Sequence, residues 1–166
     1  MNTIENEIDV CCPVFNTTLW DGKTHEWVNK LFIRDAIPEI MHMPIPGTFK
    51  KAVTGLWEAA QQVHADPPLD DFLMLCYDPS PWKGVVLLSV TKEVPGANHE
   101  RLTGTFISKV FDGPYSSIPS FIKEMDAYLL VLNKKARQYY FYYSYCPKCA
   151  KKYGHNYIVI FAEIEK

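Results

Sequence analysis

Two segments of the chain carry hydrophobic residues three and four positions apart, which is the spacing of one face of an α-helix. In the segment 48–63, the hydrophobic positions are Phe49, Val53, Leu56, Trp57, Ala60 and Val63. In the segment 118–132, they are Ile118, Phe121, Ile122, Met125, Leu129 and Leu132. We therefore predict two amphipathic helices, the first with Thr48 as its N-cap and the second with Ser117.

Apolar runs separated by proline, glycine and asparagine predict strands around these helices. The predicted strands cover residues 31–45, 72–77, 82–92, 102–111, 137–145 and 156–164. The segment Asp78-Pro79-Ser80-Pro81 separates the second strand from the third and predicts a hairpin turn. Residues 1–28 show only a brief alternation, so we expect an N-terminal arm that packs on the body as a cover and buries its own Trp20 and Trp27 there.

The predicted elements follow the order strand, helix, strand, strand, and this order occurs twice. A shift of 66 residues superposes the halves, so that Gly47 falls on Gly113, each just before a helix. We predict an α+β fold in which a βαββ unit at 29–98 is followed by a second at 99–166. The two units would form a curved antiparallel sheet, with both helices on one face and a ligand cleft on the other.

The strand at 137–145 is rich in tyrosine, and from Tyr139 onward neither of its alternating faces carries a charged side chain. The helices would cover one face, and either the N-terminal arm or an apolar ligand would cover the other. Aromatic residues form 14% of the chain, which suits either core packing or ligand stacking. The residues that we predict to line a cleft are Trp20, Trp27, Phe106, Tyr140, Tyr142, Phe161 and Glu163.

Glu163 ends a row of apolar residues that shares one face of the last strand with Phe161. One interpretation is that the end of the strand reaches water there. The other is a buried carboxyl with a raised pKa, suited to pairing with a cation or to moving a proton. If the protein is a hydrolase, Glu163 is the predicted catalytic base, with a hydroxyl of Tyr140 or Tyr142 as donor.

The Cys-Pro-Lys-Cys motif sets Cys146 and Cys149 at the spacing of half a zinc site. Neighbouring side chains of a strand point to opposite faces, so only one residue of the Cys11-Cys12 pair can join this motif; we assign Cys12. His155 is the candidate fourth ligand. The alternatives are a thiol–disulfide pair and inert thiols. Ligand binding requires no cofactor, and zinc is the one that the cysteines suggest.

The net charge of −2 gives no basic field for a nucleic acid. The acidic residues near the start are unlike a signal peptide, and no stretch approaches the roughly 18 apolar residues that span a bilayer. We therefore expect a cytoplasmic protein that binds a small molecule, without nucleic-acid or membrane partners. We expect it to be a monomer or a weak dimer.

The duplicated order, together with residues 110–115 (Val-Phe-Asp-Gly-Pro-Tyr) before the second helix, resembles the GyrI-like small-molecule-binding family. The resemblance covers about 31–164 and implies the fold of effector-binding domains and SOUL-type haem-binding proteins. Residues 11–13, 19–23 and 146–154 further resemble a stand-alone bacterial subfamily that is often labelled as hydrolases. This likeness implies a single-domain ligand binder or a hydrolase of small reactive compounds.

The chain departs from these relatives in two respects. Effector-binding relatives carry a glutamate for cationic ligands on the strand that corresponds to 137–145, where this chain has no acidic residue. We also see no helix-turn-helix segment before the domain and do not expect a role in regulation. The leading hypothesis is binding of a small apolar or amphipathic molecule. The alternatives are hydrolysis with Glu163 as base and a zinc- or thiol-stabilised structural protein.

Overall fold

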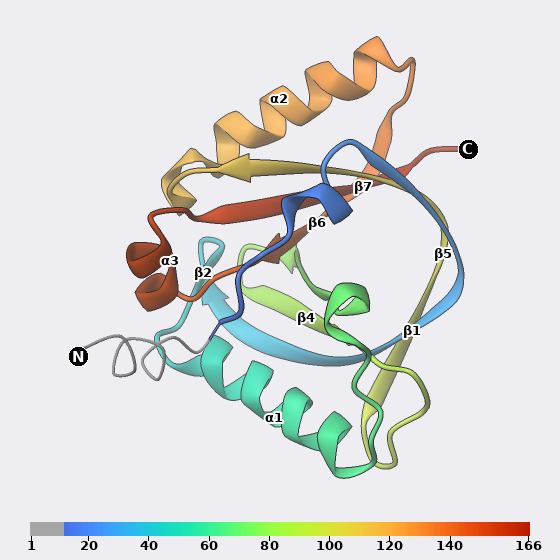
Figure 1. The fold of residues 1–166 in the computed structure, drawn as a ribbon, viewed down its shortest axis with the longest axis vertical. Coiled ribbons are helices and arrows are strands. Elements are labelled where there is room, and N and C mark those ends of the chain that lie inside the picture. Colours follow the sequence, from blue (N-terminus) through green and yellow to red (C-terminus); the bar gives the residue numbers. More distant parts are fainter. Residues whose placement is uncertain (1–11) are drawn as a thin grey trace, which may run out of the picture. The chain divides into compact units, whose positions relative to one another are not determined.

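The computed structural model describes residues 12–166, which form a mixed α+β fold with antiparallel strand pairs (Figure 1). The strands are β1 (Lys23–Ile40), β2 (Met43–Pro44), β3 (Met74–Ser80), β4 (Lys83–Ser89), β5 (Asn98–Asp112), β6 (Ala136–Tyr143) and β7 (Tyr157–Ile164). The α-helices of the described residues are α1 (Thr48–Gln62), α2 (Ile118–Val131) and α3 (Pro147–Tyr153). No helix in this part of the chain is long and apolar enough to cross a membrane.

The chain divides into two compact units. The central unit is Glu26–Thr105. The terminal unit combines the described residues up to His25 with Phe106–Lys166. The chain passes from one unit to the other within β1 and again within β5, because both strands contain a boundary between the units.

The central unit is built around β4, which is buried from Gly84 onward. Antiparallel pairs join β2 to β1, β1 to β4 and β4 to β3. Leu88 of β4, for example, faces Ile33 of β1 on one side and Met74 of β3 on the other. Helix α1 packs against β4. The buried stripe of α1 consists of Ala52, Leu56 and Ala60.

In the terminal unit, β7 lies between β5 and β6 and pairs with both in antiparallel register. Helix α2 buries Phe121, Met125 and Leu129 in a hydrophobic core that also contains Ile160 of β7. The ring of Phe121 stacks on Phe111 of β5, with centroids 4.9 Å apart. The predicted helix is confirmed, and three residues of its predicted face are buried; Ile118 and Ile122 are half-buried at the edge of this core, and Leu132 is exposed.

The first strand begins earlier than predicted. β1 starts at Lys23, inside the segment 1–28 that we expected to form an arm; residues 1–11 of that segment lie outside the described residues. The early part of β1 is mostly exposed, and polar contacts help to hold it: the hydroxyl of Thr105 donates to the carboxylate of Glu26. Hydrophobic periodicity does not detect a strand of this kind.

Two turns also lie at positions other than those predicted. The predicted strand 31–45 is divided by a turn at Met41 and His42. The predicted turn 78–81 is shorter, because β3 continues to Ser80 and the hairpin closes at Pro81-Trp82. Proline is tolerated within β3 because the strand bulges there.

The segment 146–154, which we predicted to be a loop, contains the short helix α3. Cys146 is its N-cap, Pro147 occupies the first turn, and Gly154 ends it in the left-handed region at a φ of 74°. Proline at the start and glycine at the end are ordinary helix boundary signals. A helix of seven residues is too short to show a repeating hydrophobic stripe, which is why periodicity missed it.

The core of the terminal unit gives a direct stability test on two neighbouring leucines of α2. Leu129 is 2% exposed and Leu130 is 77% exposed. We expect Leu129→Ala to lower the free energy of unfolding by about 2–5 kcal/mol, because it leaves a cavity. Leu130→Ala is the matched control and should change it by no more than about 0.5 kcal/mol. Urea denaturation measures both values, and equal effects of the two variants would contradict the assigned face of α2.

Candidate functional site

A buried carboxyl lies at the end of the hairpin between β1 and β2. Ile40 of β1 pairs with Met43 of β2, and the two residues between them have positive φ angles, 52° at Met41 and 65° at His42. This conformation matches a type I′ turn, whose twist suits a tight hairpin. Residues other than glycine rarely adopt the positive φ angles that this turn requires. The turn sets Glu39, the last buried residue of β1, close to His42.

A bulge in β3 brings a second carboxyl to the same place. From Tyr77 to Ser80 the strand advances three positions while its partner β4 advances two, from Val85 to Lys83. Such an extra residue redirects a side chain. Asp78 lies in this bulge, and its Oδ2 is 3.0 Å from Nδ1 of His42.

Glu39, His42 and Asp78 form one cluster, which we call the acid cluster. One ligand atom of each residue lies within 4.8 Å of the corresponding atoms of the other two. Glu39 is only 6% exposed, whereas His42 and Asp78 keep 54% and 33% of their side chains exposed. The acid cluster therefore has a buried inner carboxyl and an outer pair that solvent can reach.

Gly84 of β4 provides the space for the buried carboxyl. A Cβ atom at this position would lie 2.9 Å from Cδ of Glu39 and would overlap with its Oε1. Real Cβ atoms do not approach a carboxyl group so closely. Glycine at residue 84 is therefore a requirement of the acid cluster, and a larger residue would displace Glu39.

The electrostatic surroundings hold a proton on Glu39. Burial, the charge of Asp78 and a hydrogen bond with Asp78 together raise the pKa of its carboxyl to about 7, against the opposing effect of His42. Among the buried side-chain oxygens and nitrogens of residues 12–166, Oε2 of Glu39 is the atom without a hydrogen-bond partner. A carboxyl that exchanges its proton near neutral pH is suited to acid–base chemistry.

The inner wall of the acid cluster contains a thiol. Burial, followed by the charges of Asp78 and Glu39, raises the pKa of the Cys76 thiol far above its ordinary value. Cys76 is therefore a neutral neighbour and not a nucleophile, because the thiolate is the reactive form.

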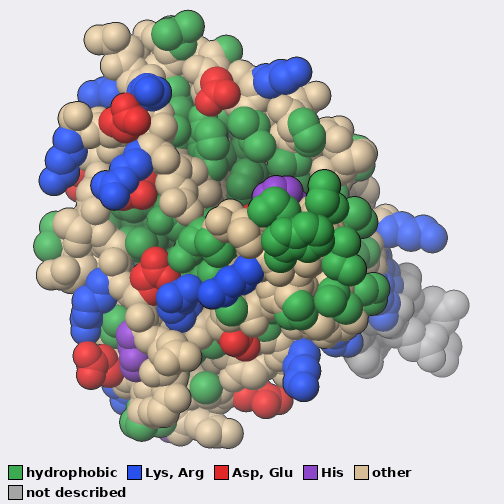
Figure 2. All heavy atoms as spheres, turned by 180° about the vertical axis from the view of Figure 1, so that it is seen from behind, with side chains coloured by type: hydrophobic (Ala, Val, Ile, Leu, Met, Phe, Trp, Pro, Cys, Tyr) green, Lys and Arg blue, Asp and Glu red, His purple; other side chains and the backbone are tan. Residues whose placement is uncertain are grey.

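Exposed hydrophobic residues adjoin the acid cluster along β1, the turn, β2 and the β3–β4 hairpin. The exposed residues of this rim are Ile40, Met41, Met43 and Trp82. Trp82 belongs to the rim because its carbonyl accepts the backbone N–H of Glu39, at 2.9 Å. Hydrophobic side chains are also exposed elsewhere on the molecule, as the space-filling view of one face shows (Figure 2). A rim of this kind suits contact with the apolar part of a small molecule.

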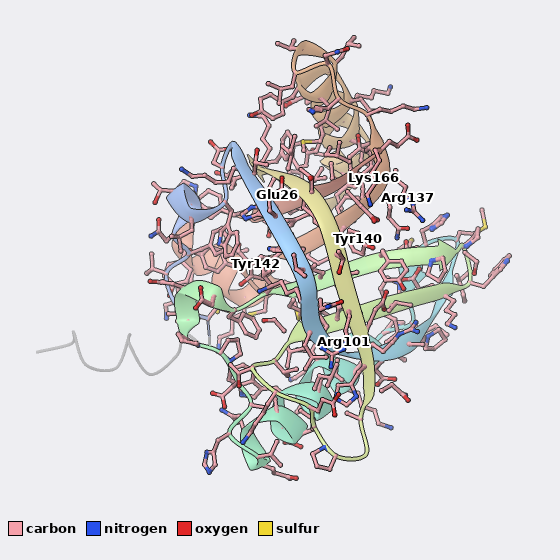
Figure 3. The ribbon with its side chains drawn as sticks, turned by 90° about the vertical axis from the view of Figure 1, so that its right-hand side faces the viewer. Glu26, Arg101, Arg137, Tyr140, Tyr142 and Lys166 are labelled. Atoms are coloured by element: carbon pink, nitrogen blue, oxygen red, sulfur yellow. The ribbon has the colours of Figure 1, made fainter. Side chains whose placement is uncertain are left out.

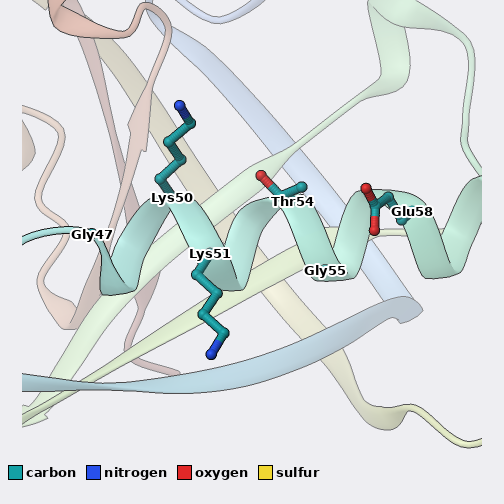
Figure 4. A pocket seen from close by; sticks show the side chains of 6 residues that line it. All are labelled: Gly47, Lys50, Lys51, Thr54, Gly55 and Glu58. Atoms are coloured by element: carbon teal, nitrogen blue, oxygen red, sulfur yellow. The ribbon is translucent and has the colours of Figure 1, made fainter.

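A shallow depression also runs along α1, with a volume of about 500 Å³ (Figure 4). Glycine and threonine leave it open, and Lys50 and Lys51 point to opposite sides of the helix. The acidic residue at its edge is Glu58, which is exposed. The depression contains no buried titratable group, and it is a weaker candidate for catalysis than the acid cluster.

The acid cluster was not predicted from the sequence. Glu39 lies between hydrophobic neighbours in a predicted strand, which is a weak signal of a buried acid. Asp78 was assigned to a turn and His42 to a strand, so nothing in the local pattern joined them. The missing information is the turn at 41–42 and the bulge in β3, which bring distant residues together.

The predicted cleft residues of the terminal unit pack against one another. Trp20 lies edge-on to Tyr142 and Phe161, with centroids 6.4 Å and 5.8 Å apart. Tyr140 lies 6.1 Å from Phe106. All five side chains are buried; Tyr140 and Tyr142 both come from β6 (Figure 3). These contacts fit the core-packing interpretation, and a role in a ligand cleft stays a prediction.

The other two predicted ligand-binding residues lie apart from this aromatic group. Trp27 is half-buried in the central unit, where its ring is 6.3 Å from that of Phe32 and Nζ of Lys30 lies 5.6 Å from its centroid. Glu163 is half-buried on β7 in the terminal unit, where it faces Phe106 of β5. Its predicted role as a base stays a prediction.

The structure brings the predicted metal-binding cysteines together. The Sγ atoms within 4.8 Å of one another are those of Cys12, Cys146 and Cys149. Cys11 lies outside the described residues. His155, the candidate fourth ligand, does not join this group, and its Nδ1 lies 2.7 Å from Oδ2 of Asp112.

Comparisons with known proteins identify relatives of the whole fold. A family described as bacterial hydrolase matches residues 2–164. No curated protein matches the chain. An uncharacterized conserved protein from Listeria innocua shares 11% identity over 87% of this chain and 92% of its own, with a TM-score of 0.63. A structure described as a hydrolase from the same organism has the same identity and coverage and a TM-score of 0.61. At this identity, the two structures show a shared fold alone.

The raised pKa of Glu39 predicts a pH-dependent gain in stability when its charge is removed. The folded state holds the proton up to about pH 7, whereas an unperturbed carboxyl loses it near pH 4.5. The free energy of unfolding therefore falls as the pH rises between these values. Relative to the wild type, we expect Glu39→Gln to become more stable from pH 5 to pH 8, by up to about 3 kcal/mol.

Urea denaturation at several pH values measures this difference. Glu58→Gln on α1 is the matched control, because Glu58 is exposed. Its stability relative to the wild type should stay constant over the same range. A Glu39→Gln curve parallel to that of the wild type would contradict the raised pKa.

Proposed function

Because the chain belongs to the bacterial hydrolase family, we propose that it hydrolyses a small, partly apolar compound at the acid cluster formed by Glu39, His42 and Asp78. The observation that carries this proposal is the buried carboxyl of Glu39, whose pKa is raised to about 7 beside a carboxyl and an imidazole that solvent reaches. Hydrolysis at neutral pH needs a group of this pKa to accept and return a proton.

Glu39 acts as the general base in the proposed reaction. Its ionised form accepts a proton from water while the water oxygen bonds to the electrophilic carbon of the substrate. The bond from that carbon to the leaving group then breaks, and the leaving group takes the proton from Glu39. None of the described residues donates a hydrogen bond to Oε2, which is itself buried, so this oxygen can accept a proton once water enters the acid cluster.

Asp78 and His42 support the base. The negative charge of Asp78 raises the pKa of Glu39, so that the carboxyl holds its proton more strongly than an ordinary glutamic acid. The contact between Asp78 and Nδ1 of His42 fixes the orientation of the imidazole ring. The other ring nitrogen, Nε2, is then available to donate a hydrogen bond to the substrate when it carries a proton.

The rim of Ile40, Met41, Met43 and Trp82 supports an apolar or amphipathic substrate. This part of the proposal keeps the ligand class that the sequence suggested but assigns it to other residues. The GyrI-like resemblance, the duplicated βαββ units and an aromatic cleft with Trp20, Trp27 and Glu163 remain proposals beside it. They predict the same ligand class at a different surface, so variants can distinguish the two sites.

Hydrolysis of activated esters tests the proposal. With p-nitrophenyl acetate and butyrate, we expect kcat/KM of the wild type to rise with pH through about 7, because the ionised form of Glu39 is the active one. Glu39→Gln should reduce kcat/KM at pH 8 by at least about 100-fold. The longer butyrate chain should react with the lower KM, because it contacts the rim. Wild-type protein without turnover above buffer would contradict the proposal.

Three controls assign the activity to the acid cluster. Glu58→Gln should leave the rate unchanged, because Glu58 is exposed on α1. Glu163→Gln tests the base that the sequence suggested. If Glu163→Gln loses the activity while Glu39→Gln keeps it, the catalytic site lies on β7 instead. Activity that disappears in chelator and returns with a divalent cation would make the acid cluster a metal-ligand set, a role that its donor groups also fit.

A further inference from the structure

Three sulfur atoms of the terminal unit converge from two distant segments. Cys12 is the first of the described residues, whereas Cys146 and Cys149 lie at the first turn of α3. The three Sγ atoms lie within 4.8 Å of one another. A Cys-x-x-Cys pair alone fits several chemistries, but a third sulfur from a remote segment at the same point is characteristic of a metal site.

The spacing of the sulfurs fits zinc. A tetrahedral Zn²⁺ site with Zn–S bonds of about 2.3 Å has sulfur–sulfur edges of about 3.8 Å. The three Sγ atoms lie within 4.8 Å of one another, so each sulfur–sulfur distance needs to shorten by at most about 1 Å to reach this geometry. Thiolate sulfur is a ligand that selects zinc over magnesium and calcium, which prefer oxygen.

Backbone groups already point at the sulfurs. The N–H of Cys149 donates to Sγ of Cys146, and the N–H of Cys146 donates to Sγ of Cys12, each at 3.5 Å. Hydrogen bonds of this kind orient ligands and stabilise the negative charge of thiolates. Lys148, on the same short helix, adds a positive charge close in sequence to both cysteines of the motif.

Contacts outside the sulfurs hold the two segments in register. The hydroxyl of Tyr153 donates to the carbonyl of Cys12 at 2.7 Å, and the N–H of Phe15 donates to the hydroxyl of Tyr145 at 2.8 Å. The rings of Tyr145 and Tyr153 lie 4.7 Å apart. The group is therefore supported by a second layer of contacts, as a preorganised ligand site requires.

From these contacts we infer that Cys12, Cys146 and Cys149 bind one Zn²⁺ ion, which fastens the segment before β1 to α3. The ion binds the three thiolates, whose protons pass to solvent, and a water molecule completes the tetrahedron. The site is structural: it joins segments that are more than 130 positions apart in the chain, as the hydrogen bond between Cys146 and Cys12 shows. It is independent of the acid cluster, which lies in the central unit.

Metal analysis of the purified full chain tests this inference. Protein produced in zinc-supplemented medium and exchanged into metal-free buffer should retain about one zinc per chain, measured by mass spectrometry of the elements. Cys12→Ser and Cys149→Ser should each reduce this content at least about tenfold. Cobalt added to the reduced apoprotein should give the intense thiolate charge-transfer bands of a tetrahedral site, and the variants should lose them.

Two controls separate this site from other sources of zinc. Cys76→Ala removes a thiol of the central unit, and Glu39→Gln removes a carboxylate of the acid cluster; both should retain the zinc. Because Cys149 is fully buried, circular dichroism must show that its variant folds. Cys12 is only partly buried, so Cys12→Ser keeps the test valid if Cys149→Ser unfolds.

A readout on the cysteines themselves completes the test. The thiols of the zinc-loaded protein should react with a thiol reagent at least about tenfold more slowly than after treatment with a strong chelator. Chelator should also lower the melting temperature of the wild type and leave that of Cys12→Ser unchanged. Wild-type protein without stoichiometric zinc, an iron–sulfur absorption spectrum, or zinc that persists in both cysteine variants would overturn the inference.

Discussion

The burial of one carboxyl beside another is the constraint on which the acid cluster depends. Moving an ionised carboxylate out of water costs several kcal/mol, and a second negative charge nearby adds to the cost. Glu39 reduces it by keeping a proton up to about pH 7. The arrangement also needs two non-glycine residues with positive φ, a bulge at Asp78 and a glycine at residue 84. Strained backbone positions and bulges of this kind often lie at functional sites, and here they coincide around one buried carboxyl.

The two long helices could be predicted because each buries one face over several turns. The stripes that contain Leu56 and Met125 repeat often enough to exceed chance, and these two residues are buried while other members of the stripes are half-buried or, like Leu132, exposed. The start of β1 could not be predicted in this way, because side-chain hydrogen bonds such as that of Thr105 to Glu26 contribute to it. α3 was missed because its seven residues are too few to repeat a pattern.

The two candidate sites differ in how much of each the sequence revealed. The cysteines were found because zinc ligands are few in type and two of them lie in one short motif. Glu39 and Asp78 are common residue types, and their proximity depends on the turn at 41–42 and the bulge in β3. Glu163 was predicted as a site residue because it ends a row of apolar residues on one face of β7. The pattern of one strand does not show which residues of other strands lie close to it. Local sequence therefore identifies a site only when the chemistry itself is rare.

The two sites also act on stability in opposite directions. The acid cluster stores unfavourable energy, because the charged form of Glu39 is disfavoured in the fold. A zinc ion on Cys12, Cys146 and Cys149 would add stability, because the three cysteines lie close enough to bind it together only in the folded state. Native proteins have a net stability of only about 5–15 kcal/mol. If both proposals hold, the chain would contain one site that lowers its stability and one that raises it, each within its own unit.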